Sequence, residues 1–384
     1  MIERIDPQTM LKFKKWAYPL FWLMMLPMWY LAGTAGENGT QNYWAWYLYF
    51  FIFGLIPIVD YLLGQDPSNP DEHTQVPTMS EEKIYRVFTL VMAVLWFLVL
   101  FYSGHLFISN DYNLLGQIGW IISVGTVGGI IAINLGHELV HKDPKIENWT
   151  GGLLLASVCY AGFKVEHVRG HHVKVSTPED ASSARYNQSL YHFLPRAFYH
   201  NFLNAWRLEK EYLERKGLKN ISRHNELIWW YGFSALLAVA FGLLFGWMGV
   251  LFFLAQGFVA AFTLEVINYV EHYGLHRRQD ANGRYERTTP AHSWNSNYFL
   301  TNIALFHLQR HSDHHAYAKR RYQVLRHYDE SPQLPAGYAT MYALAFFPPL
   351  WRKVMNPRVE AYYEGEMDQL FRDQKRHNNI AATN

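Results

Sequence analysis

Four short stretches of this chain contain nine of its 19 histidines, at spacings typical of metal ligands. The stretches are HELVHK (137–142), EHVRGHH (166–172), NYVEHYGL (268–275) and LQRHSDHHA (308–316). Side chains four residues apart share one face of a helix, so His137 and His141 would be presented together. Imidazole is a common ligand of iron, zinc, copper and nickel. The clustering therefore predicts a metal site rather than nine unrelated surface or interior histidines.

The number of imidazoles predicts two metal ions. An octahedral first-row ion takes about six ligands, and the nine candidates exceed that number. Divided between two ions, they leave four or five for each and at least one open position, which favours oxygen chemistry and hence iron. The candidates are His137, His141, His167, His171, His172, His272, His311, His314 and His315.

Two other kinds of function are open at this point. HELVH matches the HExxH motif of zinc proteases, with His137 and His141 as ligands and Glu138 as general base. That mechanism leaves the other seven histidines without a role. A metal transporter or sensor would place its ionisable groups near the middle of a membrane, whereas these histidines gather at one end of the apolar segments.

Six apolar segments are expected to cross a membrane and to position the histidines. Several windows of about 19 residues are apolar enough to do so. We expect an all-α integral membrane protein with spans at about 16–33, 43–63, 86–107, 114–141, 227–247 and 249–271. Gly125 and Gly129 have the GxxxG spacing that lets two helices approach closely. The whole chain, 1–384, is expected to be one membrane-embedded catalytic domain, with segments 142–225 and 272–384 forming a histidine-rich cap.

The distribution of basic residues predicts the orientation in the membrane. The loops after the first, third and fifth spans contain no Lys or Arg, whereas the N-terminal region, 142–225 and the C-terminal region are rich in both. The positive-inside rule then places both ends of the chain, and all four histidine stretches, on the cytoplasmic side. The formal charge of +2 gives no indication of nucleic-acid binding. The single cysteine, Cys159, excludes a disulfide framework within the chain.

Taken together, the four stretches resemble the membrane-bound non-haem diiron alkane 1-monooxygenases (alkane ω-hydroxylases) of the fatty acid desaturase and hydroxylase superfamily. The resemblance extends from the first span to about Asn356 and includes TPEDASSAR (177–185) and HSWNSN (292–297). It implies that all nine histidines are catalytic iron ligands and that the cofactor is a pair of iron ions, with O₂ as co-substrate. It further implies hydroxylation of the terminal methyl group of linear alkanes to 1-alkanols.

The resemblance also implies partners and a location. The electron donor would be rubredoxin, itself reduced by a NADH-dependent rubredoxin reductase, and the alkane would enter from lipid. The location would be the bacterial inner membrane, with several spans and a cytoplasmic active site. The alternative is a related diiron hydroxylase or desaturase that acts on another hydrocarbon or on a fatty acyl chain. A docking patch for the acidic donor is expected among Arg169, Lys174, Arg310, Lys319, Arg320, Arg321 and Arg326.

Two further sets of residues are predicted around the ligands. Carboxylates often accept the free ring N–H of a ligating histidine, and those close in sequence are Glu138, Glu166, Asp180, Glu271 and Asp313. Residues three and four positions apart share a helix face, so counting back from His137 and His272 predicts which residues line a substrate channel. These are Ile130, Ile133, Ala261, Leu264 and Asn268.

Overall fold

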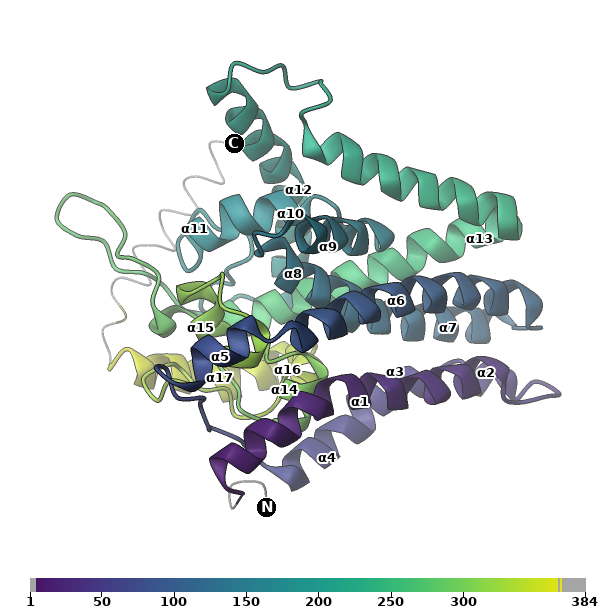
Figure 1. Ribbon diagram of the computed structural model, residues 1–384, viewed down its shortest axis with the longest axis horizontal. Helices are drawn as coiled ribbons and strands as arrows, with labels where there is room; N and C mark the ends of the chain where they lie inside the picture. Colours follow the sequence, from purple (N-terminus) through teal and green to yellow (C-terminus); the bar gives the residue numbers. More distant parts are fainter. Residues whose placement is uncertain (1–4, 365–366, 368–384) are drawn as a thin grey trace.

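The chain folds into helices joined by loops. The computed structural model describes residues 5–364 and residue 367. Within that part of the chain there is no β-strand, and three isolated β-bridges are the only β-type pairing. Figure 1 shows long helices extending side by side toward one end of the molecule and shorter helices gathered at the other end. The predicted all-α fold class is therefore confirmed.

Three helices among the described residues are long and apolar enough to cross a membrane. They are α6 (Lys83–Ser109), the continuous helix Leu114–Val140, and α13 (Glu226–His272). The second of these comprises α7 (Leu114–Gly128), the π-helical turn η3 (Gly129–Ile133) and α8 (Asn134–Val140). In α13, the φ of 69° at Gly246 breaks the helix, and its two arms run in opposite directions (Figure 1). These helices coincide with the last four predicted spans.

The first two predicted spans have different structures. Helix α1 (Pro7–Thr34) is continuous although it contains Pro19 and Pro27. The second segment is divided into α2 (Gln41–Trp44), α3 (Tyr47–Phe50), the π-helical turn η2 (Phe51–Leu55) and α4 (Ile56–Leu63). Pro57 has no N–H to donate and its ring crowds the preceding turn, which accounts for the wider turn before α4.

The helix carrying His137 and the helix carrying His272 cross at two glycines. A Cβ atom added to Gly125 would lie 2.5 Å from Cβ of Val259, and one added to Gly129 would lie 3.0 Å from Cβ of Thr263. Any side chain at these positions would therefore push the two helices apart. The close approach predicted from the GxxxG spacing is confirmed, and it brings two of the histidine stretches together.

Shorter helices surround the histidines at the other end of the molecule. Among them, α9 (Lys145–Ser157) is a packed helix with Leu154 and Leu155 fully buried. Cys159, just beyond its end, has a φ of 55° that a helix cannot accommodate. The others are α5 (Gln75–Glu81), α10 (Phe163–Glu166), η4 (His167–His171), α11 (His172–Lys174), α12 (Leu190–Arg215), η5 (Pro290–His292), α14 (Phe299–Ala304), α15 (His311–Ala316), η6 (Tyr322–Val324), α16 (Tyr338–Ala345) and α17 (Pro348–Tyr362).

Candidate metal centre

The nine histidines of the four stretches lie together in two groups. One group has five members and the other has four, and within each group the candidate ligand atoms all lie within 4.8 Å of one another. The five are His137, His141, His167, His172 and His314; the four are His171, His272, His311 and His315. Each group draws its members from at least three of the four stretches, so neither could form from one segment alone.

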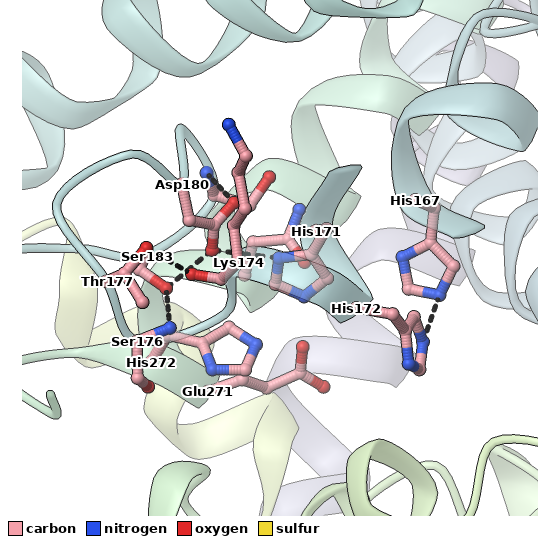
Figure 2. A network of polar contacts seen from close by, with 12 residues as sticks. His167, His171, His172, Lys174, Ser176, Thr177, Asp180, Ser183, Glu271 and His272 are labelled. Atoms are coloured by element: carbon pink, nitrogen blue, oxygen red, sulfur yellow. Dashed lines mark hydrogen bonds and ion pairs between the residues drawn. The ribbon is translucent and has the colours of Figure 1, made fainter. Parts of the chain in front are cut away.

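Local helix geometry decides which group each histidine joins. In α15, His311 and His315 are four residues apart and their Nε2 atoms lie 2.9 Å from each other. In the stretch 167–172 the backbone forms the π-helical turn η4, which is wider than an α-helical turn. There the residues that meet are five apart: Nε2 of His167 lies 3.0 Å from Nε2 of His172 (Figure 2). His171, in the same turn, joins the other group.

The distances between ring nitrogens fit ligands of a common ion. An ion about 2.1 Å from two nitrogens at a right angle would hold them about 3.0 Å apart. In the five-histidine group, Nε2 of His172 and of His314 are 3.0 Å apart. In the four-histidine group, His311 to His272 and His171 to His315 are each 3.2 Å. Within each group, the ring nitrogens are therefore spaced as ligands of one ion would be.

The electrostatics of the site also suit metal binding. Burial, followed by the neighbouring imidazoles, lowers the pKa of His167, His172 and His314 well below the usual value. The same two causes lower the pKa of His311 and His315. The rings are therefore neutral near pH 7, and a metal need not displace a proton to bind them.

Two buried nitrogens add a further observation. Nε2 of His137 and Nε2 of His141 have no hydrogen-bond partner among the described residues. Buried polar atoms are rarely left without a partner, and a metal ion would supply one for both. The donor set of nine imidazoles is compatible with first-row transition metals such as iron.

Asp180 contacts the outer ring nitrogen of one of the nine histidines. Its Oδ2 accepts a hydrogen bond from Nδ1 of His171 over 2.9 Å, and also one from Oγ of Ser183 over 2.6 Å (Figure 2). Burial alone would raise the pKa of Asp180, but His171 and these hydrogen bonds outweigh it, so that the pKa lies below its usual value. An ionised Asp180 therefore fixes the ring of His171 with Nε2 turned toward the other members of its group.

Glu271 does not take the position predicted for it. It was expected to accept an outer ring N–H, yet its Oε2 lies 3.1 Å from Nε2 of His311, the nitrogen that also faces His272 and His315. Its Oε1 has no hydrogen-bond partner among the described residues. Glu271 directly precedes His272 at the end of α13, and Figure 2 shows the two side chains next to each other. The carboxylate of Glu271 therefore lies on the inner side of the four-histidine group.

Three other predicted carboxylates contact the polypeptide around the site. Glu138 pairs with Lys142 at 3.0 Å and accepts the backbone N–H of Tyr322 at 3.2 Å. Asp313 accepts the backbone N–H of Arg326 and the hydroxyl of Tyr328. Glu166 is buried and lies close to Gly170: a Cβ atom added to Gly170 would lie 2.7 Å from Oε1 of Glu166. These contacts fix the loops that carry the histidines.

An apolar cavity reaches the histidines from the side of the long helices. It has a volume of about 70 Å³ and it meets His137, His167, His311 and Glu271. Ile130, Leu264 and Asn268, three of the residues expected to line a substrate channel, are part of its wall. Sequence periodicity missed the contributions of other elements, whose residues carry no signal beyond being mostly apolar. These include Ile52, Phe53, Ile56, Ala304, Leu305, Leu308, Ala339 and Tyr342.

Two predicted channel residues lie elsewhere. Ile133 is fully buried in the core and is not part of the cavity wall, because the π-helical turn Gly129–Ile133 shifts the register of the helix. Ala261 lines a different cavity. Segment 158–163 covers its helix there, and a Cβ on Gly257 would lie 2.8 Å from the carbonyl oxygen of Val158.

Two of the buried histidines outside the groups, His307 and His276, have other partners. Nε2 of His307 lies 3.0 Å from the hydroxyl of Tyr18, and His276 stacks on Tyr363 with ring centroids 4.4 Å apart. Both histidines are packing residues at the end of the molecule that holds the two histidine groups. His105 lies in α6 beside Tyr102, and His377 falls outside the described residues.

Comparisons with known proteins agree with this geometry. Residues 112–345, which include all nine histidines, match the family model of fatty acid desaturases. Alkane 1-monooxygenase 2 of Alcanivorax borkumensis is 72% identical over 382 residues, covering 99% of this chain and 100% of the relative. Alkane 1-monooxygenases 2 and 1 of Pseudomonas aeruginosa are 58% and 56% identical over 375 residues, covering 96% and 97% of this chain and 98% of each relative.

Proposed function

Because the chain belongs to the alkane 1-monooxygenases within the fatty acid desaturase family, we propose that it hydroxylates the terminal methyl group of linear alkanes. The products are 1-alkanols, and O₂ is the co-substrate. The observation that supports this most directly is the position of the two histidine groups, which lie at the end of a narrow apolar cavity. A thin, unbranched chain is the substrate shape that such a cavity admits.

The proposed cofactor is a pair of iron ions bound by the nine histidines as five and four ligands. When bound, the iron ions supply the activation of O₂ and the oxidation of an unpolarised C–H bond, a reaction that amino-acid side chains cannot carry out by themselves. The protein contributes imidazole ligands, an apolar cavity and orientation of the chain end. Ile130 and Leu264 exclude water along the cavity, and Asp180 fixes the ring of His171.

The electron donor we propose is rubredoxin, reduced in turn by a NADH-dependent reductase. A cavity whose wall includes His141, His172, Lys142 and Lys319 reaches the five-histidine group from outside, and electrons could enter there. The docking patch expected from the sequence needs one correction. Arg310 is buried and donates to backbone carbonyls of Asp66, Ser68 and Leu325, so it cannot contact a donor protein.

We further propose a six-span topology in the bacterial inner membrane, with both ends and the metal centre on the cytoplasmic side. The chain would form one membrane-embedded catalytic domain, since the histidines come from segments throughout its length. The basic residues beside the histidine groups and the absence of Lys and Arg from the opposite loops support this orientation. Reporter fusions after Thr34, Ser109 and Gly246 should report the outer side, and a fusion within 216–224 should report the cytoplasm.

The function is tested by metal analysis and product identification on purified protein. We expect about two irons per chain, negligible zinc, and conversion of octane to 1-octanol when rubredoxin, its reductase, NADH and O₂ are supplied. One zinc per chain, with proteolysis of a membrane substrate, would support the HExxH protease instead. Formation of 2-octanol as the main product would contradict terminal hydroxylation while leaving the diiron centre intact.

A further inference from the structure

A second cavity lies beside the metal centre, with Phe163 in the wall of both cavities. It has a volume of about 340 Å³ and lies between segment 158–163, α12 and the second arm of α13. The ring of Phe163 stacks on His167 with centroids 4.5 Å apart. This one aromatic side chain therefore contacts a histidine of the five-histidine group, the apolar cavity and the second cavity.

The rim of the second cavity is apolar and exposed. Phe202, Leu254 and Phe258 line it, and each belongs to the large apolar side chains that the protein leaves exposed, Phe258 to 61%. Leu254 and Phe258 lie on a helix that is apolar enough to cross a membrane. An aliphatic chain could therefore extend from this cavity into lipid without exposing apolar surface to water.

One polar group in the wall lacks a partner. Asn201 is only 5% exposed, and its Nδ2 donates to Oγ of Ser182 at 3.0 Å and to Oε1 of Glu265 at 3.2 Å. Oε1 of Glu265 also accepts from the hydroxyl of Tyr160, so this oxygen is an acceptor and the amide of Asn201 must present Nδ2 to it. Oδ1 of Asn201 is then directed elsewhere, and it has no hydrogen-bond partner among the described residues.

We propose that this cavity binds a primary alkanol, whose hydroxyl donates to Oδ1 of Asn201 while its chain passes Phe258 toward lipid. A buried acceptor without a partner is unfavourable, and a hydroxyl at the end of an aliphatic chain supplies the missing donor. The choice of an alkanol rests on the proposed function, because the adjoining metal centre would form that molecule. An alkane has no donor, so Asn201 favours product over substrate, and rotation of the Phe163 ring would connect the two cavities.

Binding can be tested without turnover by photolabelling the iron-loaded protein in lipid nanodiscs. The probe is a decanol with a diazirine near the end of the chain opposite the hydroxyl. We expect labelled peptides from 198–202 and 254–261. Excess 1-decanol should compete about tenfold better than the methyl ether of equal length, which accepts but cannot donate a hydrogen bond. This comparison uses the parent protein and does not depend on a variant folding correctly.

Two variants and a control locate the site. Asn201→Leu should make alcohol and ether equal competitors, and Ala261→Phe should fill the cavity and abolish labelling there. Ala339→Phe, which alters only the apolar cavity at the histidines, should leave the labelling unchanged. Equal competition by alcohol and ether in the parent, or no label on the two peptides, would overturn the proposal. Separate measurement of 1-octanol formation distinguishes such a failure from a failure of the proposed hydroxylation.

Discussion

Nδ1 of His171 donates to Oδ2 of Asp180 across 2.9 Å, and both side chains are almost completely buried. The hydrogen bond fixes the tautomer of His171, leaving the lone pair of Nε2 for a metal ion. It also explains how a residue in the turn His167–His171 is held toward the four-histidine group while its neighbours belong to the other.

Replacing Asp180 by Asn should therefore loosen one metal site. The amide cannot reproduce the charge that fixes the His171 ring, and loss of such outer contacts typically lowers metal affinity or activity 10- to 100-fold. We expect iron to fall from about two toward one per chain, with a matching loss of hydroxylation. The control is Glu179→Gln, which changes an adjacent carboxylate that is exposed and pairs with Lys174 at 3.0 Å. Full iron content in Asp180→Asn would show that Asp180 does not position a ligand.

Removing a histidine from either group should have a larger effect. His137→Ala removes one histidine of the five-histidine group. One histidine of the four-histidine group is removed by His171→Ala, His272→Ala or His315→Ala. Each should abolish measurable alkane hydroxylation and lower bound iron, because two ions are needed for the reaction. His105→Ala should change neither quantity, since this residue lies in α6 away from both groups. Normal turnover by His272→Ala would remove that residue from the centre.

Glu271→Gln tests the carboxylate on the inner side of the four-histidine group. The ionised side chain would add negative charge where four imidazoles would bind a cation, so the neutral amide should weaken iron binding at this site. We expect faster loss of one iron to a chelator, about tenfold or more, and a change in the Mössbauer signal of one iron of the two. Identical spectra and equal iron retention in parent and variant would show that Glu271 does not affect iron binding and is only part of the wall of the apolar cavity.

Rubredoxin docking should depend on Lys319, which is 77% exposed beside the cavity that reaches His141 and His172. Lys319→Glu should raise the KM for rubredoxin several-fold at low ionic strength, and the difference should shrink as salt screens the charges. The matched control is Lys210→Glu on α12, whose lysine pairs with Glu214 and does not line that cavity. A KM for rubredoxin that is independent of both salt and Lys319 would indicate docking elsewhere.

Much of the centre could be predicted because histidine composition and spacing are local properties. All nine histidines of the four stretches enter the two groups, and the glycine pair at 125 and 129 sets the helix crossing as expected. The division into five and four could not be predicted, because it depends on the π-helical turn at 167–171. An ideal helix would have placed His167 and His171 on one face.

Side-chain direction and burial were the properties that the sequence left undetermined. The position of the Glu271 carboxylate depends on the direction in which the last turn of α13 points. The surroundings of Ala261 depend on which segment covers that part of α13. Neither property is encoded by the spacing of residues in the sequence. Arg310 looked like a surface cation, but its guanidinium is buried and donates hydrogen bonds to three backbone carbonyls. Contacts between distant segments decide such cases, and a single sequence contains no direct record of them.

The position of Ala261 changes the prediction for substrate length. Ala339 lines the apolar cavity that ends at the histidines, whereas Ala261 lines the second cavity. Ala339→Phe should therefore shorten the longest alkane accepted, lowering kcat/KM for long chains about tenfold or more while short chains change little. Ala261→Phe should keep the parent's chain-length profile. Competition between alkanes of increasing length, measured at equal iron content, checks both variants. A shortened profile in Ala261→Phe together with an unchanged one in Ala339→Phe would mean that the substrate occupies the second cavity.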